Sequence, residues 1–175
     1  MSQSRRVPFS WWRIAVGFAQ EKLARPVVHP LTRRHPPVGD VVARFAIPLA
    51  LCPTTNDTRE RPSWWHKKHR DELFTVMAPQ FLTARLVRGK ALPGRPQVRC
   101  VRFSSVPTDP CADWAKTAVD RLILPLYVTR KGKRVDCKRF GILADDTLEA
   151  VDEYQWWEPA PPGEGCAYIE IRTGE

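Results

Sequence analysis

The hydrophobic and polar positions of residues 113–124 recur with the period of an α-helix. At about 100° per residue, one side of this segment is apolar, and Asp113, Lys116 and Asp120 gather on the other side. Asp109 followed by Pro110 is typical of a helix start, because Asp accepts hydrogen bonds from free backbone N–H groups and proline gives up no needed donor there. The pattern therefore predicts a helix with one face in the core and carboxylates around a single lysine on the other. The apolar side is formed by Trp114, Ala115, Ala118, Val119, Leu122 and Ile123.

The rest of the chain alternates between strand-like and helix-like patterns. Residues 41–51 form an apolar run in which Pro48 indicates a strand at a sheet edge. Ser63 is expected to cap a helix that ends near Ala78, with Trp65, Leu73, Val76 and Met77 as its buried stripe. Two strands are expected within residues 81–105, on either side of a turn at 89–96, and a final antiparallel pair at 148–157 and 166–173. The order predicts an α+β fold: a small mixed or antiparallel β-sheet with two main helices packed on one face.

Residues 1–40 differ from the domain expected over residues 41–175. The segment is basic, with helical potential at residues 9–24 and a proline-rich linker at residues 25–39. We expect an N-terminal helical extension that packs on the domain or on a dimer partner, or that serves as an extra nucleic-acid arm.

Composition narrows the class of protein. A chain of 175 residues with 43% hydrophobic residues has room for one real core, which excludes a disordered class. The net charge of +9 favours an anionic partner, either nucleic acid or an acidic membrane surface, and no apolar run is long enough to predict a membrane span. Residues 143–158 carry six acids and no Lys or Arg, whereas residues 130–139 carry six basic residues and one acid. The pattern indicates a cation site within a basic surround.

Cysteine and histidine spacing gives little support for a zinc site. The five cysteines are odd in number and widely spaced, which favours reduced thiols in a cytoplasm. His66 and His69 have helical i, i+3 spacing, yet neither a cysteine nor a carboxylate is placed beside them in sequence as a further ligand. Exposed histidines on a basic helix are the preferred interpretation.

Three basic segments are candidate nucleic-acid contacts. Cations next to Trp64 and Trp65 suit phosphate contact and base stacking, although tryptophan in a helix is more often in the core. The arginines of residues 85–102 form either a solvated face or a track for phosphates. The third segment is the basic loop expected at residues 127–140. The predicted DNA contacts are Lys67, Lys68, Arg70, Arg102, Lys131, Lys133 and Arg134.

Three motifs in this order resemble the RusA family of Holliday junction resolvases, over about residues 45–172. Pro53-Thr-Thr-Asn56 resembles the family's Pro-Pro-Ser-Asn loop after the first strand. Asp109 to Leu122 resembles Asp-x-Asp-Asn followed by Lys and then Asp-x-Leu, and Gly141 to Asp146 resembles the short hydrophobic lead into Asp-Asp. The last two motifs together are the more specific part of the resemblance.

The resemblance implies a homodimeric, Mg²⁺-dependent endodeoxyribonuclease, with Mn²⁺ as a possible substitute, that resolves Holliday junctions or related branched DNA by paired nicks. It implies a cytoplasmic location, in a bacterium or a phage-infected host. The metal ligands would be Asp109, Asp113, Asp145 and Asp146, with Lys116 and Asp146 as catalytic residues. Phosphodiester hydrolysis suits this set, since carboxylate oxygens hold hard cations and a lysine can stabilise the developing charge.

The chain also departs from the family pattern. When Lys116 and Asp120 are aligned with the family's Lys and Asp, Pro110 and Ala112 fall where the family has its two metal-binding aspartates. Either the ligands have shifted onto Asp109 and Asp113, which we favour, or the site is degenerate. About twelve extra residues around 130–139 are expected to form an additional DNA-contacting loop. The alternatives are a catalytically inactive RusA-like DNA-binding protein, or an unrelated basic interaction protein in which the aspartates act as helix caps, helix-surface ion pairs and turn residues.

Overall fold

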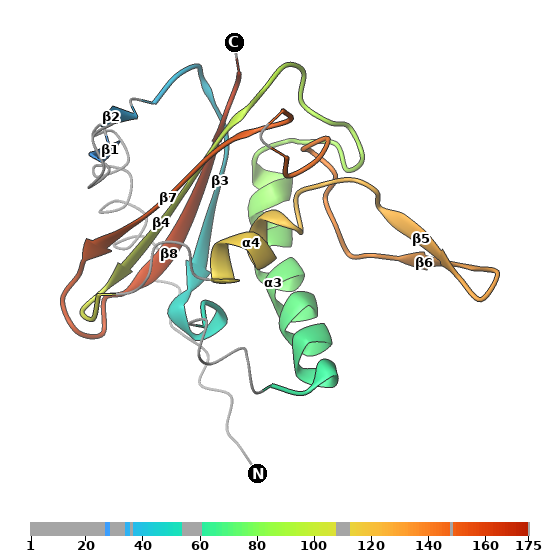
Figure 1. Ribbon diagram of the computed structural model, residues 1–175, viewed down its shortest axis with the longest axis horizontal. Helices are drawn as coiled ribbons and strands as arrows, with labels where there is room; N and C mark the ends of the chain where they lie inside the picture. Colours follow the sequence, from blue (N-terminus) through green and yellow to red (C-terminus); the bar gives the residue numbers. More distant parts are fainter. Residues whose placement is uncertain are drawn as a thin grey trace.

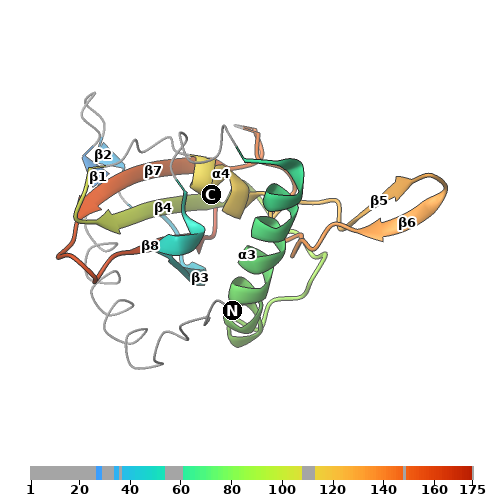
Figure 2. The same cartoon turned by 90° about the horizontal axis from the view of Figure 1, so that it is seen from below.

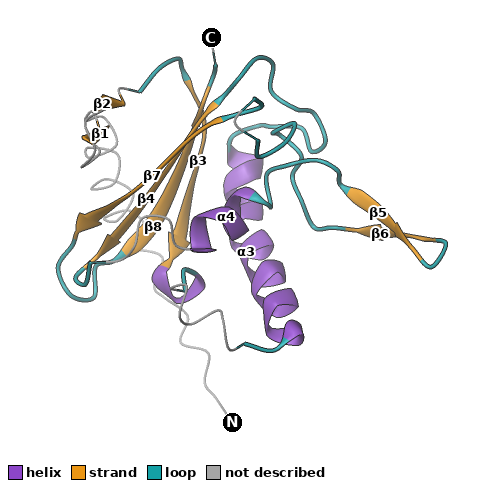
Figure 3. Cartoon of the chain, in the orientation of Figure 1, coloured by secondary structure: helices purple, strands orange, loops and turns teal. Residues whose placement is uncertain are grey.

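The computed structural model describes residues 27–28, 34–35, 37–53, 61–107, 113–147 and 149–174, with side chains from residue 37 onward and only the backbone of Asp113. The main sheet contains β3 (Val41–Pro48), β4 (Gln97–Ser104), β7 (Asp152–Pro159) and β8 (Cys166–Arg172), in the order β3-β8-β4-β7. The helices are α3 (Ser63–Thr83), α4 (Asp113–Val119) and the short 3-10 helix η1 (Leu49–Leu51). Two small ladders complete the described elements: β1 (Val27–Val28) with β2 (Arg34–His35), and β5 (Tyr127–Arg130) with β6 (Lys133–Asp136). The predicted α+β fold is confirmed, while the helix expected at residues 9–24 lies outside the described residues (Figures 1 and 3).

Both helices cover one face of the mixed sheet (Figures 1 and 2). Alternate residues of β4 point to opposite faces, so that Val98 and Cys100 join the main core under the helices, whereas Val101 and Phe103 join a smaller cluster on the other face. α3 contributes Leu73, Met77 and Phe81 to the main core, four residues apart along one stripe. The predicted buried stripe was therefore partly correct, because Trp65 and Val76 are only half-buried.

α3 continues past the proline that was expected to end it. Pro79 lies inside the helix, which ends at Thr83 rather than near Ala78. Phe81, expected in a strand, is helical and stacks on Phe140 with ring centroids 4.6 Å apart. Gln80 bonds both backbone groups of Ala46 on β3. These contacts made after Pro79 offset the missing proline N–H, a loss that costs about 3 kcal/mol in an isolated helix.

Strand pairing also differs from the expectation. Residues 81–105 contain one strand, β4, rather than two. β7 and β8 do not pair with each other, because β4 lies between them, parallel to β7 and antiparallel to β8. The connection at residues 160–165 therefore spans a strand instead of closing a hairpin. β3 is an edge strand, as Pro48 predicted.

The basic segment after α4 is a hairpin, not a loop. β5 and β6 pair antiparallel, and the hairpin projects away from the sheet and helices in both perpendicular views (Figures 1 and 2). α4 itself ends at Val119, five residues earlier than the expected helix end at Leu124. Leu122 and Ile123 nevertheless remain in the core, as the helical pattern predicted for the whole apolar side.

Candidate functional site

The apolar side of α4 is buried and its polar side faces outward. Trp114, Ala115, Ala118 and Val119 are each at most 2% exposed. Lys116 lies on the opposite side, with 70% of its side chain exposed. Burial of the first face therefore fixes which way Lys116 points.

A small backbone ladder brings the Asp145-Asp146 turn beside α4. Ile123 and Leu143 form a parallel bridge, and the N–H groups of Ile142 and Leu143 both donate to the Leu122 carbonyl, at 2.7 and 3.0 Å. The N–H of Leu124 donates in return to Leu143 at 3.1 Å. Because Leu143 is held on the segment that follows α4, the acidic turn two residues later reaches the polar side of the helix.

Lys116 and Asp146 form the centre of the candidate site. Lys116 Nζ lies 2.8 Å from Asp146 Oδ2, although the two residues are 30 positions apart. This hydrogen bond lowers the pKa of Asp146 and raises the pKa of Lys116. Asp145 Oδ1 accepts from the Asp146 N–H at 2.8 Å, which orders the turn. The carboxylate of Asp146 is thus ionised and already beside a cation.

Glu153 on β7 is a further acidic group that the sequence did not single out for this site. It faces the same side of the sheet as Val98, its partner across the ladder, and this is the side covered by the helices. The pKa of Glu153 is raised, mainly because burial removes water from its carboxylate. The hydrogen bond from Gln155 and the charge of Lys116 lower this pKa in part, and the charges of Asp146 and Asp120 raise it further. The alternation of β7 could have indicated this side, but only if its pairing with β4 had been known.

The donors gathered around Lys116 are carboxylate oxygens, which are the ligands that Mg²⁺ and Mn²⁺ prefer. Asp146 and Asp145 come from one turn, Glu153 comes from β7, and Asp120 is the residue directly after α4, so the donor chemistry fits a hard cation. Within the described side chains, no group of three or more His, Cys, Asp or Glu is arranged to hold a metal ion. Asp109 and the side chain of Asp113 lie outside the described residues, although α4 begins at Asp113, one turn before Lys116.

The predicted basic contacts of α3 are exposed at its first half. Lys67, Lys68 and Arg70 all face solvent, and Lys68 makes a long ion pair with Glu72, at 3.8 Å. Trp64 is 64% exposed, which is unusual for a large apolar side chain and leaves its ring free to stack.

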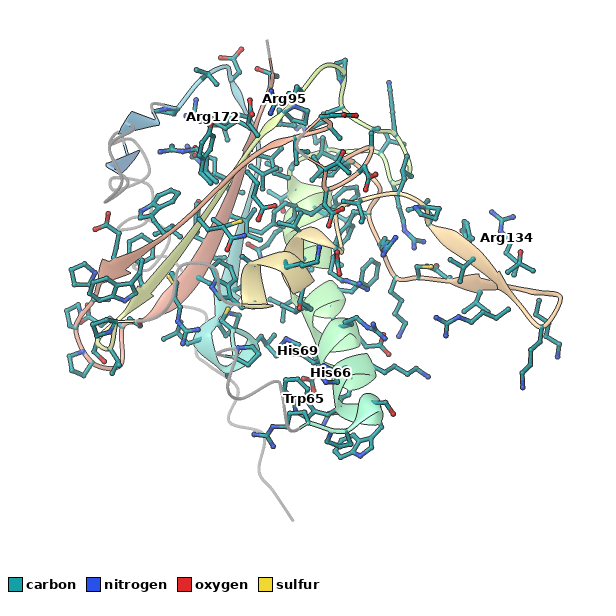
Figure 4. The ribbon with its side chains drawn as sticks, viewed as in Figure 1. Trp65, His66, His69, Arg95, Arg134 and Arg172 are labelled. Carbon is teal, nitrogen blue, oxygen red and sulfur yellow. The ribbon has the colours of Figure 1, made fainter. Side chains whose placement is uncertain are left out.

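The expected exposure of both histidines is wrong for His69. It is only 5% exposed, its ring stacks on Trp65 at 4.9 Å, and its Nε2 has no hydrogen-bond partner among the described residues (Figure 4). His69 therefore belongs to the packing of α3 rather than to its solvent face.

The remaining predicted contacts divide into two kinds. Arg102 is half-buried and donates from a guanidinium nitrogen to the Cys52 carbonyl oxygen, which gives it a structural partner. Lys131, Lys133 and Arg134 are all exposed on the β5–β6 hairpin. The hairpin, more than β4, presents free positive charge.

Comparison with models of protein families, with curated proteins and with solved structures gives no match for this chain. The RusA resemblance remains a hypothesis based on the motifs. Among the described residues, no helix has both the length and the apolar character needed to cross a bilayer.

Proposed function

We propose that the chain is a divalent-metal-dependent endodeoxyribonuclease that nicks Holliday junctions or related branched DNA. The observation that carries the proposal is the 2.8 Å contact between Lys116 Nζ and Asp146 Oδ2, which joins two of the RusA-like motifs in space. A turn of two adjacent aspartates beside the single lysine of α4, on the side of the helix opposite its buried face, is the arrangement that those motifs require. Positive charge on α3 and on the hairpin supplies the means to hold a polyanion.

The residues of the candidate site have separate roles in this proposal. Asp146, with Asp145, would hold the metal ion, and Asp109 and Asp113 remain the proposed partner ligands. A bound Mg²⁺ would supply Lewis acidity and lower the pKa of an attacking water. Lys116 would leave Asp146 and place its ammonium against the phosphate oxygens, where negative charge develops. Its largely exposed side chain is free to make that movement.

Cleavage of a synthetic four-way junction tests the proposal. The wild-type protein should give paired nicks with Mg²⁺, and Asp146→Asn should abolish them while junction binding persists. Asp152→Asn is the matched control, because Asp152 pairs with Arg95 at 2.6 Å and points to the opposite face of the sheet. Equal cleavage by wild type and Asp146→Asn would refute the assignment.

Metal binding can also be followed without activity. Mg²⁺ should raise the melting temperature of the wild type and of Asp152→Asn, but not that of Asp146→Asn, since a ligand that binds only the folded state stabilises it. Lys116→Met should increase the rise in melting temperature at a given Mg²⁺ concentration, because the ammonium of Lys116 competes with the ion for Asp146.

A second candidate is a catalytically inactive DNA-binding relative. It is favoured by the lack, within the described side chains, of a group of three possible metal ligands. Such a protein would bind junctions with strong salt dependence, yet cleave none of them with Mg²⁺ or Mn²⁺.

We also propose a homodimer in a cytoplasmic setting. Two equivalent nicks in a nearly two-fold-symmetric junction follow most simply from a two-fold dimer with two sites. All four described cysteines are free thiols, which suits a reducing compartment. Analytical ultracentrifugation with and without junction DNA gives the stoichiometry directly.

A further inference from the structure

The β5–β6 hairpin has a regular and compact geometry. Its strands pair from Tyr127 with Asp136 to Arg130 with Lys133, leaving a two-residue turn. Both turn residues have positive φ, 49° at Lys131 and 73° at Gly132, which is the type I′ turn that matches strand twist. Four residues per strand at about 3.3 Å each give an arm roughly 13 Å long.

The base of the arm is held by contacts to α3 and to the segment that follows α3. Arg88 donates from Nε to the Arg139 carbonyl and from a terminal nitrogen to Asp136 Oδ1, both at 2.6 Å, and its guanidinium lies over the rings of Phe74 and Tyr127. Lys138 Nζ pairs with a carboxylate of α3 at 2.9 Å. The arm therefore leaves the domain in a defined direction (Figure 4).

The tip of the arm is entirely cationic. Residues 130–134 comprise four basic side chains and one glycine, all exposed, and the single acid of the hairpin, Asp136, is paired at the base with Arg88. Arg130 and Lys133 lie directly opposite each other across the ladder. Like charges at facing positions destabilise a strand pair, and a bound polyanion would relieve this repulsion.

We propose that this hairpin arm enters the major groove of a B-form DNA duplex and binds the phosphates on its rims. The major groove is about 12 Å wide and about 8.5 Å deep and accepts a two-stranded β-ribbon. The arm is longer than this depth, so its tip can reach the floor of the groove. One face would present Val128, Arg130, Lys133 and Val135, and the other Tyr127, Thr129 and Arg134, whose guanidinium lies 3.8 Å over the Tyr127 ring.

The inference rests on the proposed function only for its choice of DNA as the ligand. It adds a second DNA contact, on one duplex of the junction, at a fixed position relative to Lys116 and Asp146. The hairpin leaves α4 and returns to the acidic turn through the Ile123–Leu143 bridge, so arm and site share one base. Groove binding would therefore set where along the duplex the phosphate meets the site.

Two matched double variants test the arm. Arg130→Gln/Lys133→Gln removes the facing cations, and Arg85→Gln/Lys90→Gln removes two exposed cations between α3 and β4. Binding to a 30-base-pair duplex is measured over a range of salt concentrations without Mg²⁺. The hairpin variant should lower the slope of log K against log salt by about 2 and weaken binding roughly 30-fold at 0.15 M salt. The control variant should match the wild type.

The melting temperature of the hairpin variant should equal or exceed that of the wild type, because a repulsive pair is removed. Equal slopes for the two variants would overturn the inference. So would a hairpin variant that sediments as a monomer where the wild type is a dimer, since the arm would then be a dimer contact.

A duplex RNA of the same sequence separates groove entry from general attraction. The deep, narrow major groove of A-form RNA does not admit the ribbon, so the two variants should bind RNA alike. An equal loss on RNA and DNA by the hairpin variant would refute groove entry. If the hairpin variant weakens duplex binding but the wild type does not cut junctions, only the proposed nuclease activity is refuted. If the wild type cuts junctions but the hairpin variant binds the duplex as the wild type does, only the role of the arm is refuted.

Discussion

Gln80 provides a sharp test of how α3 is joined to the sheet. Its Oε1 accepts from the Ala46 N–H at 2.7 Å, and its Nε2 donates to the Ala46 carbonyl at 3.0 Å. β3 is an edge strand, so these outward backbone groups have no neighbouring strand. The side-chain amide acts as a one-residue substitute for that strand, at a position where Ala46 is only 2% exposed.

Gln80→Met keeps the size of the side chain and removes both hydrogen bonds to Ala46, together with the bond from Nε2 to the Val76 carbonyl within α3. A buried backbone group left without a partner costs about 1–3 kcal/mol, and water can reach part of this half-buried site, so the expected loss is about 2–3 kcal/mol. In a chain of this size the loss corresponds to roughly 4–12 °C in melting temperature. Gln80→Glu keeps the acceptor but not the donor, and should fall between Gln80→Met and the wild type.

Urea unfolding, compared at constant m value, measures these differences. Thr83→Ala is the control, because the Thr83 hydroxyl donates to the Pro79 carbonyl at an exposed position, and it should stay within about 0.5 kcal/mol of the wild type. A Gln80→Met variant as stable as Thr83→Ala would show that the amide does not hold the edge of the sheet.

Three further predictions follow from buried ionisable groups. Glu170→Gln should cost about 3–5 kcal/mol in urea unfolding, because the fully buried Arg99, 3.4 Å away, would lose its counter-charge, whereas the exposed Glu164→Gln should be neutral. Burial lowers the pKa of His69 below 6.5, so the unfolded chain takes up this proton first and stability should decline as pH falls below about 6.5; His69→Leu should reduce that decline, and parallel pH curves would refute the explanation. Burial raises the pKa of three thiols, that of Cys166 to about 11, so iodoacetamide at pH 8 should leave them unmodified until the protein is unfolded, as mass spectrometry of alkylated peptides would show. These thiols are Cys52, Cys100 and Cys166.

The local pattern predicted the two sides of residues 113–124 well, and the buried stripe of α3 only in part. The period of residues 113–124 placed all six apolar residues in the core, and the lysine on the outside, because burial of one side is decided within the segment itself. The edge position of β3 was likewise readable from Pro48, since a proline cannot donate to a second neighbour.

Features that depend on distant partners could not be predicted. The helix was expected to stop before Pro79, because the compensating contacts of Gln80 and Phe81 lie on β3 and at Phe140. The sequence placed β8 next to β7, because nothing in either strand reveals that β4 lies between them. Because the pairing of β7 with β4 was not predicted, the sequence also did not indicate that Glu153 lies near enough to Lys116 for their charges to interact.

The candidate site was predicted in part. The Lys116–Asp146 contact agrees with the expectation that the helix and the acidic turn meet, whereas the proposed ligand Asp109 and the side chain of Asp113 lie outside the described residues. The basic residues at 130–139 were expected in a loop, and their pattern did not predict that they form a hairpin. Gly132, which can adopt the positive φ of a two-residue hairpin turn, was the local signal that could have shown it.

The bridge between Ile123 and Leu143 has an engineering consequence. Since the chain leaves and re-enters the domain at this bridge, the intervening hairpin can be exchanged as a unit. Shortening it, or grafting a ribbon with other side chains in its place, should leave Lys116 and Asp146 in register. The DNA-binding specificity of the hairpin and the proposed phosphodiester cleavage could then be varied separately within a single polypeptide.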